Sequence, residues 1–259
     1  RTELERVERT SFLLLLLALV LLLLVFVPGL GVRINGARRW IHLGISGFQS
    51  VEAVKLLLIV YLGSYLVRQR ESVQRQLFGV VKPVGVAGLV VVLLLAQPDF
   101  GSATLIIATT VGMVWLGGAR MRNLFLLGAP LLPALAWAAL TQDYRVKRLT
   151  SFLDPWKDPF NDGFQLTQAL IAVGRGEWTG VGLGGSIQKL YYLPEAHSDF
   201  ILAVIAEELG LAGIVLVLAL FAWLCGRGLL LGLRCVQRGL HFQGNVAFGI
   251  SLCIALQAL

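Results

Sequence analysis

The chain has 259 residues, of which 57% are hydrophobic and only 14% are charged. With a mean hydropathy of +0.78, the composition excludes an ordinary soluble domain and predicts a polytopic membrane protein. The net charge of +7 does not by itself indicate nucleic acid as a partner. The basic residues stand in short clusters between apolar runs, as they do at the cytoplasmic ends of membrane spans.

Spanning helices need about 20 mostly apolar residues. The sequence holds seven such segments, roughly 11–31, 48–67, 80–97, 100–118, 124–141, 200–224 and 242–259. The expected fold class is therefore all-α, a polytopic transmembrane helical bundle with at least seven spans. The chain starts without Met and ends inside an apolar run. We therefore expect residues 1–259 to form a single membrane domain that is truncated at both ends.

The distribution of Lys and Arg over the short loops predicts which side each loop faces. One side holds Arg1, Arg6, Arg9, Arg68, Arg70, Arg75, Lys82, Arg120, Arg122, Arg227, Arg234 and Arg238. The opposite short loops hold only Arg33, Arg38 and Arg39. We therefore expect the first side to be cytoplasmic and the long segment 142–199 to lie outside.

The two central spans near residue 98 are joined only by the sequence Gln-Pro-Asp-Phe at 97–100. Pro98 does not continue a helix comfortably, so a tight helical hairpin is predicted. Asp99 stands where it can cap the helix that starts at Phe100, and capping is the role we favour for it. Glu52 and Lys55 lie three residues apart on another span and predict an ion pair on one helix face.

The external segment 142–199 is too long to be a simple connector. Within it, residues 164–173 place Leu166, Leu170 and Val173 at helical spacing, with Asp162 as the cap and Gly174 as the stop. This pattern predicts a short amphipathic helix at the membrane surface. A glycine-rich stretch follows, in which Gly180, Gly182 and Gly185 imitate a dinucleotide fingerprint. No βαβ unit surrounds it, so we interpret these glycines as turn and close-approach positions.

Asp199 stands at the mouth of the sixth predicted span. Its carboxylate suits a general base, but Ser198 and Asp199 are also residue types that start helices, so a cap is an equal alternative. Glu195, His197 and Asp199 alternate in an extended strip that also resembles a metal site, although the spacing is loose. A Ser-His-Asp hydrolase is disfavoured, because the three residues are adjacent in sequence.

Glu207 lies about 12 Å further along the same span, close to the middle of an apolar layer about 30 Å thick. Such a carboxylate usually faces a bundle interior or a water-filled cavity. A buried acid, bonded with Glu208 to neighbouring helices, is the alternative of equal weight. The external cations suit a substrate with anionic phosphate groups, although simple solvation of a loop accounts for most of them singly: Arg33, Arg38, Arg39, Arg145, Lys147, Arg148, Arg175 and Lys189.

Four stretches resemble the SEDS family of lipid II polymerases, and in particular the branch that serves cell division in Gram-negative bacteria. They are NGARRW at 35–40, AQPDFG at 96–101, DPWKDPFNDGFQLTQALIAVGRGEW at 154–178 and GLGGSIQKLYYLPEAHSDFILAVIAEELG at 182–210. The chain departs from the family in two places. Gln49-Ser50-Val51-Glu52 lacks the proline of the usual Gln-Pro-small-Glu motif, and the family's C-terminal Ser-Tyr-Gly-Gly motif does not occur.

This resemblance implies about ten spans and a peptidoglycan glycosyltransferase that polymerises lipid II. It implies Asp199 as the base for the acceptor hydroxyl. It also implies Arg38, Arg39 and Lys189, together with Arg148 and Arg175, as the partners of the departing pyrophosphate. Trp40 and His197 complete the expected substrate-binding set, while Glu52, Lys55, Asp99 and Glu207 are expected to support the cavity.

The resemblance also implies a setting for the protein. It places the chain in the bacterial inner membrane at the division septum, with 142–199 as a large periplasmic loop beside the active site. The implied partners are an FtsI-type class B penicillin-binding protein and FtsQ, FtsL and FtsB. It assigns no cofactor, and a divalent cation at the pyrophosphate stays open without a visible ligand set. A lipid II flippase and a non-catalytic divisome scaffold are the alternative functions.

Overall fold

The computed structural model describes residues 2–34, 37–42, 47–141, 143–161, 163–194, 196–197 and 199–258. The chain divides into two compact units. Unit 1 comprises residues 1–130 and 224–259, and unit 2 comprises residues 131–223. Helices dominate both units, as the apolar segments predict.

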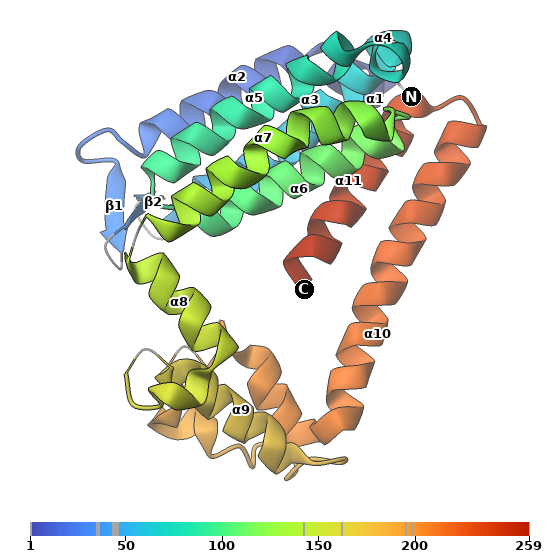
Figure 1. Cartoon of the computed structure of the whole chain (residues 1–259). Helices are drawn as coiled ribbons and strands as arrows, with labels where there is room; N and C mark the ends of the chain where they lie inside the picture. Colours follow the sequence, from blue (N-terminus) through green and yellow to red (C-terminus); the bar gives the residue numbers. More distant parts are fainter. Residues whose placement is uncertain are drawn as a thin grey trace. The chain divides into compact units, whose positions relative to one another are not determined.

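Unit 1 is a helical bundle with a small sheet (Figure 1). Its elements are α1 (Thr2–Arg9), α2 (Ser11–Leu24), β1 (Gly31–Ile34), β2 (Ala37–His42), β3 (Gly47–Gln49), α3 (Ser50–Arg68), α4 (Arg70–Arg75), α5 (Leu77–Ala96), α6 (Phe100–Leu116), the start of α7 (Met121–Leu140), the end of α10 (Ile201–Gln237) and α11 (His241–Ala258). The strands form an antiparallel sheet in the order β1-β2-β3. The sheet was not predicted, and it occupies the segment that carries the NGARRW motif.

The core of unit 1 lies between α2, α3, α5, α6 and α11, which pack in the pairs α2 with α3, α5 with α6, and α11 with both α3 and α6. Leu22, Val54 and Leu62 are fully buried there. Large apolar side chains also point outward, among them Phe12 on α2 and Val92 on α5. Apolar side chains on both the inner and the outer faces of helices are typical of membrane spans.

Each of the seven predicted apolar segments contains a helix. Within the described part of the chain, α3, α5 and α10 are long and apolar enough to cross a membrane. The pair α1 and α2, bent by 63°, makes a fourth span if it is counted as one. Helix α6 is apolar but shorter, with 17 residues. Helix α10 continues through 225–237, a stretch that the sequence predicted as a cytoplasmic loop.

The residue range of unit 2 includes the whole of the long predicted external segment, 142–199. Its elements are the end of α7, α8 (Asp143–Leu153), the short 3-10 helix η1 (Pro155–Lys157), α9 (Phe164–Gly176), the π-helical turn η2 (Gln188–Tyr192) and the start of α10. Short helices inside this segment were expected from its sequence, and they are present.

Candidate active site

Helix α10 is broken at Gly210, whose φ of 64° and ψ of −160° are not helical. The break exposes backbone groups, and the glycine-rich segment 177–182 satisfies them. The N–H groups of Leu211 and Ala212 donate to the carbonyls of Glu177 and Trp178, at 2.9 and 3.2 Å. A break in a helix is tolerated when another segment takes up the freed hydrogen bonds.

The same segment also bonds to the other side of the break. The N–H groups of Val181 and Gly182 donate to the carbonyls of Glu207 and Glu208, at 3.0 and 3.1 Å. A side chain on Gly180, where φ is +79°, would collide with the backbone of Glu208. The prediction that these glycines serve turns and close approach is therefore confirmed for Gly180.

The carboxylate of Glu207 is fully buried, with an exposed fraction of 0%. It accepts hydrogen bonds from Arg175 Nη1 at 3.1 Å and Ser186 Oγ at 2.5 Å. The backbone N–H groups of Ile187 and Gln188 add two more, at 3.2 and 3.3 Å. A buried charge is costly unless it is paired and hydrogen-bonded, and this one has four donors. The expectation of a buried acid bonded to neighbouring segments is confirmed for Glu207.

Glu208 holds the same segment from the next position on α10. Its Oε1 lies 2.5 Å from Lys189 Nζ in an ion pair. The two acids therefore fix residues 186–189 to α10. The sequence did not identify Ser186, although it lies in one of the motifs that carry the resemblance.

Three residues of the segment before α10 belong to a small apolar cluster. Leu193 and Ala196 are buried against α9 and the first turn of α10, with Phe200 packed beside them. His197 and Asp199 lie in the same segment before α10, and both are exposed.

The structure gives Asp199 no capping contact. Helix α10 begins at Ile201, and the Phe200 carbonyl accepts from the N–H groups of Ala203 and Val204, at 3.0 and 3.3 Å. Over the described ranges, no hydrogen bond or ion pair engages the Asp199 carboxylate. Of the two alternatives that the sequence left equal, the described structure does not support the N-cap.

Helix α9 packs through its small residues rather than its large ones. Ala169, Ala172 and Gly176 are buried, and a side chain on Gly176 would collide with the Ala206 carbonyl. Leu170 and Val173 are 42% and 41% exposed, so the predicted apolar stripe faces away from unit 2. The helix ends at Gly176 rather than Gly174, and its predicted cap Asp162 lies outside the described residues.

Arg39 belongs to unit 1 and joins β2 to the hairpin between α5 and α6. Its guanidinium donates to the Pro98 carbonyl, and Nη1 lies 4.0 Å from Asp99 Oδ1. Asp99 caps α6, because its carboxylate accepts from the N–H and the hydroxyl of Ser102, at 3.2 and 2.8 Å. Gln97 donates to the Leu22 carbonyl at 2.9 Å. The predicted hairpin and the predicted cap are both confirmed.

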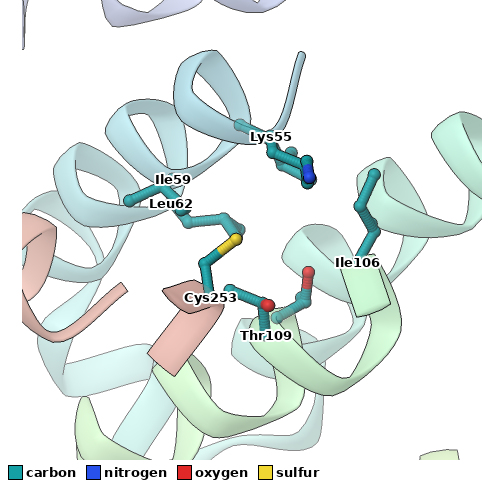
Figure 2. A pocket seen from close by; sticks show the side chains of 8 residues that line it. Lys55, Ile59, Leu62, Ile106, Thr109 and Cys253 are labelled. Atoms are coloured by element: carbon teal, nitrogen blue, oxygen red, sulfur yellow. The ribbon is translucent and has the colours of Figure 1, made fainter. Parts of the chain in front are cut away.

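Lys55 and Glu52 form the predicted ion pair, with Nζ and Oε2 2.7 Å apart. Lys55 is buried in the bundle, where it lines a cavity of about 10 Å³ together with Thr109 and Cys253 (Figure 2). This volume suits about one water molecule. The hydroxyls of Thr109 and Thr110 are buried without a partner in the described part of unit 1.

Several predicted site residues are not brought together by the described structure. Trp40 lies on β2, where it pairs with Gln49. The side chains of Arg33, Arg38, Arg145 and Arg148 lie outside the described part, as does Glu195. Among the described residues, no group of three or more His, Cys, Asp or Glu side chains is placed to hold a metal ion.

The apolar helices define a polytopic membrane protein. Its polar site is built on a helix that is broken at Gly210 and that carries the buried acid Glu207. Irregular backbone in such a helix is tolerated where it is buried in protein. The chain belongs to the FtsW/RodA/SpoVE family of cell cycle proteins, which it matches over residues 1–259.

Two curated relatives carry the name probable peptidoglycan glycosyltransferase FtsW. The protein of Xanthomonas oryzae pv. oryzae is 54% identical over 258 residues, which cover 100% of this chain and 53% of that protein. The protein of Legionella pneumophila subsp. pneumophila is 49% identical over 258 residues, covering 100% of this chain and 66% of that protein. The chain thus spans between about half and two thirds of the length of these relatives.

Two solved structures resemble the chain. One comes from work on the structural coordination of polymerization and crosslinking by a peptidoglycan synthase complex. It gives a TM-score of 0.74 at 27% identity, and the match covers 98% of this chain and 69% of that chain. The other is the rod shape determining protein RodA of Thermus thermophilus, with a TM-score of 0.60 at 28% identity, covering 95% of this chain and 64% of that chain.

Proposed function

We propose that this chain carries the central part of a peptidoglycan glycosyltransferase that polymerises lipid II into glycan strands for septal wall synthesis. The observation that carries the proposal is Asp199, an exposed carboxylate directly before α10 with no partner among the described residues. A base must be free to take a proton and fixed well enough to meet its substrate. The names of the FtsW relatives support the same activity.

The proposed reaction is a single inverting displacement. The Asp199 carboxylate takes the proton of the 4-hydroxyl of the GlcNAc on an incoming lipid II, and that oxygen attacks the anomeric carbon of the growing glycan. The bond from this carbon to the carrier pyrophosphate breaks, and its electron pair leaves with undecaprenyl pyrophosphate. The α-linked donor thereby gives a β-1,4 bond, and the proton stays on Asp199.

The departing pyrophosphate needs positive charge, for which Arg38, Arg39 and Lys189 are the proposed partners. Lys189 is paired with Glu208, yet a third of its side chain stays exposed. Arg175 donates to Glu207 and is 41% exposed, so it retains free donors. Arginine offers several donors to phosphate oxygens at once. Arg148, Trp40 and His197 complete the proposed substrate-binding set.

The proposed setting is the septal region of the inner membrane, with the active site on the periplasmic side. The proposed partners are an FtsI-type class B penicillin-binding protein and FtsQ, FtsL and FtsB. One structural relative was described as part of a peptidoglycan synthase complex that coordinates polymerization and crosslinking, which supports a crosslinking partner.

The test uses the full-length protein with its penicillin-binding partner and labelled lipid II in detergent. Wild type should give glycan ladders on a gel, and Asp199→Asn should give none. The matched control is Asp154→Asn, which changes another exposed acid of unit 2 and should polymerise normally. Near-normal ladders from Asp199→Asn would overturn the base assignment.

The same preparations in vesicles separate the alternatives. Translocation of lipid II without ladders would identify a flippase. If neither ladders nor translocation occur in the wild type while division is supported in cells, the protein is a scaffold. Both results would overturn the proposed activity.

A further inference from the structure

A further cavity lies in unit 1, and none of the residues assigned to the reaction lines it. It has a volume of about 250 Å³ and forms where the last turns of α3, α6 and α10 meet α4 and the start of α11. Its polar wall consists of Arg70, Gln74, His241 and Asn245. The basic loops adjoin this end of the bundle, so it is the end that the arginine distribution assigns to the cytoplasm.

Arg70 brings an uncompensated positive charge to this wall. Its Nη1 lies 3.2 Å from His241 Nε2. A guanidinium only donates hydrogen bonds, so in this contact Nε2 of the imidazole is the acceptor. The contact therefore holds the guanidinium without neutralising it. In the part of unit 1 that the structure describes, no carboxylate forms an ion pair with Arg70.

The surroundings strengthen the positive charge. A neighbouring hollow of about 490 Å³ is lined by residues between Val67 and Gln76. It shares Val67 and Arg70 with the cavity of about 250 Å³. Arg68 and Arg75 line it as well, and Glu71 is the one acid among its lining residues. A wall with more cations than acids attracts an anion, and arginine is well suited to bind phosphate oxygens at two points.

The remaining wall of the cavity of about 250 Å³ is apolar. Leu66, Leu116 and Phe248 line it. A free phosphate ion would leave this half of the cavity unused. An amphiphile with a phosphate head and an acyl chain matches both halves. Anionic lipids are concentrated in the cytoplasmic leaflet, and basic pockets between spanning helices on that side bind their head groups.

We propose that this cavity binds an anionic glycerophospholipid of the cytoplasmic leaflet. The phosphate contacts Arg70, and the start of one acyl chain lies along Leu66, Leu116 and Phe248. The lipid would join α3, α4, α6 and α11 at the cytoplasmic end of the bundle. This inference does not depend on the proposed glycosyl transfer, because it uses none of the residues proposed for that reaction.

The test measures lipid retention by full-length protein with native mass spectrometry. The probes are phosphatidylglycerol and phosphatidylcholine with identical acyl chains, and glycerol phosphate as the free head group. We expect wild type to retain phosphatidylglycerol at least tenfold more strongly than phosphatidylcholine. Arg70→Gln should lose about tenfold of that affinity, and Arg70→Lys, which keeps the charge, should lose less.

The matched control is Arg238→Gln, which removes a charge from the same predicted side at a residue that lines neither of the two cavities. It should leave retention unchanged. Equal loss in Arg70→Gln and Arg238→Gln would show a general charge effect and overturn the site. Equal retention of the two lipids, as expected if an acidic peptide occupies the cavity, would also overturn it. If glycerol phosphate binds as tightly as the lipid, the ligand of the cavity is a soluble phosphate, and the lipid proposal is overturned.

Discussion

Asp199, just before α10, and Glu207, within it, are carboxylates eight residues apart, yet their surroundings are opposite. Asp199 is exposed, and the described residues give its carboxylate no partner. Glu207 is fully buried and accepts four hydrogen bonds. The difference shows how one stretch of sequence provides both a reactive group and the support that holds it in place. Glu207, with its four hydrogen bonds, stabilises residues 186–189. Asp199, which has no partner among the described residues, is available to a substrate.

The comparison predicts its largest effect for Asp199→Asn, which should separate activity from stability. The polymerisation rate should fall by roughly 10²–10⁴-fold, because a positioned base contributes about that factor. The melting temperature in detergent should not change, since no described contact is lost. Single-turnover assays and thermal unfolding of the same preparation measure the two quantities. A large drop in melting temperature would show that Asp199 stabilises the fold and would contradict this prediction.

Glu207→Ala should have the reverse effect and act mainly on stability. The substitution leaves Arg175 and two backbone N–H groups without their acceptor. Leaving a buried donor without its acceptor costs about 1–3 kcal/mol, so the free energy of unfolding should fall by at least that amount. Denaturant unfolding in mixed micelles, with Asp154→Ala as the exposed control, measures this change. If Glu207→Ala unfolds like the control, the carboxylate does not hold the loop.

The sequence predicted the local parts of this arrangement and not the distant ones. The Asp99 cap and the Glu52–Lys55 pair depend on residues three apart, so spacing alone identifies them. The partners of Glu207 lie on α9 and at Ser186, and no spacing rule connects segments so far apart in sequence. From the sequence, a buried and bonded Glu207 was one of two equal alternatives, and the groups that surround it were not predicted.

The break in α10 was missed for a similar reason. Gly210 lies within a predicted span, where a single glycine is usually accommodated within a helix. The glycine-rich segment before α10 was recognised as a close-approach stretch, but its partner was not. The break depends on pairing between two segments, each of which resembles an ordinary helix or loop when read alone.

Gly210→Ala tests whether the pairing of the glycine-rich segment 177–182 with α10 stabilises the region between Asp199 and Glu207. A side chain there would meet the backbone of residues 178–180, and φ at +64° is unfavourable for alanine. The conformational cost alone is about 1–3 kcal/mol, so unfolding should become easier by at least that amount. Gly226→Ala, also on α10 but with open space around the new methyl, should be neutral or stabilising.

Hydrogen exchange would locate the effect of Gly210→Ala. The N–H groups of Val181 and Leu211 should lose protection, because each donates a hydrogen bond between the glycine-rich segment and α10, on either side of Gly210. Unchanged protection at both would mean that the glycine-rich segment does not depend on the break in α10.

Lys189→Met should give the smallest change in stability and thereby separate support from substrate binding. The Lys189–Glu208 pair is partly exposed, and such pairs contribute only about 0.2–1 kcal/mol. If Lys189 also binds the pyrophosphate, kcat/KM for lipid II should still fall about tenfold, since charge-assisted bonds to phosphate are strong. Lys157→Met, an exposed lysine of the same unit, is the matched control. A loss of activity no greater than in that control would make Lys189 a support for Glu208 alone, and would leave the charge for the leaving group to Arg38 and Arg39.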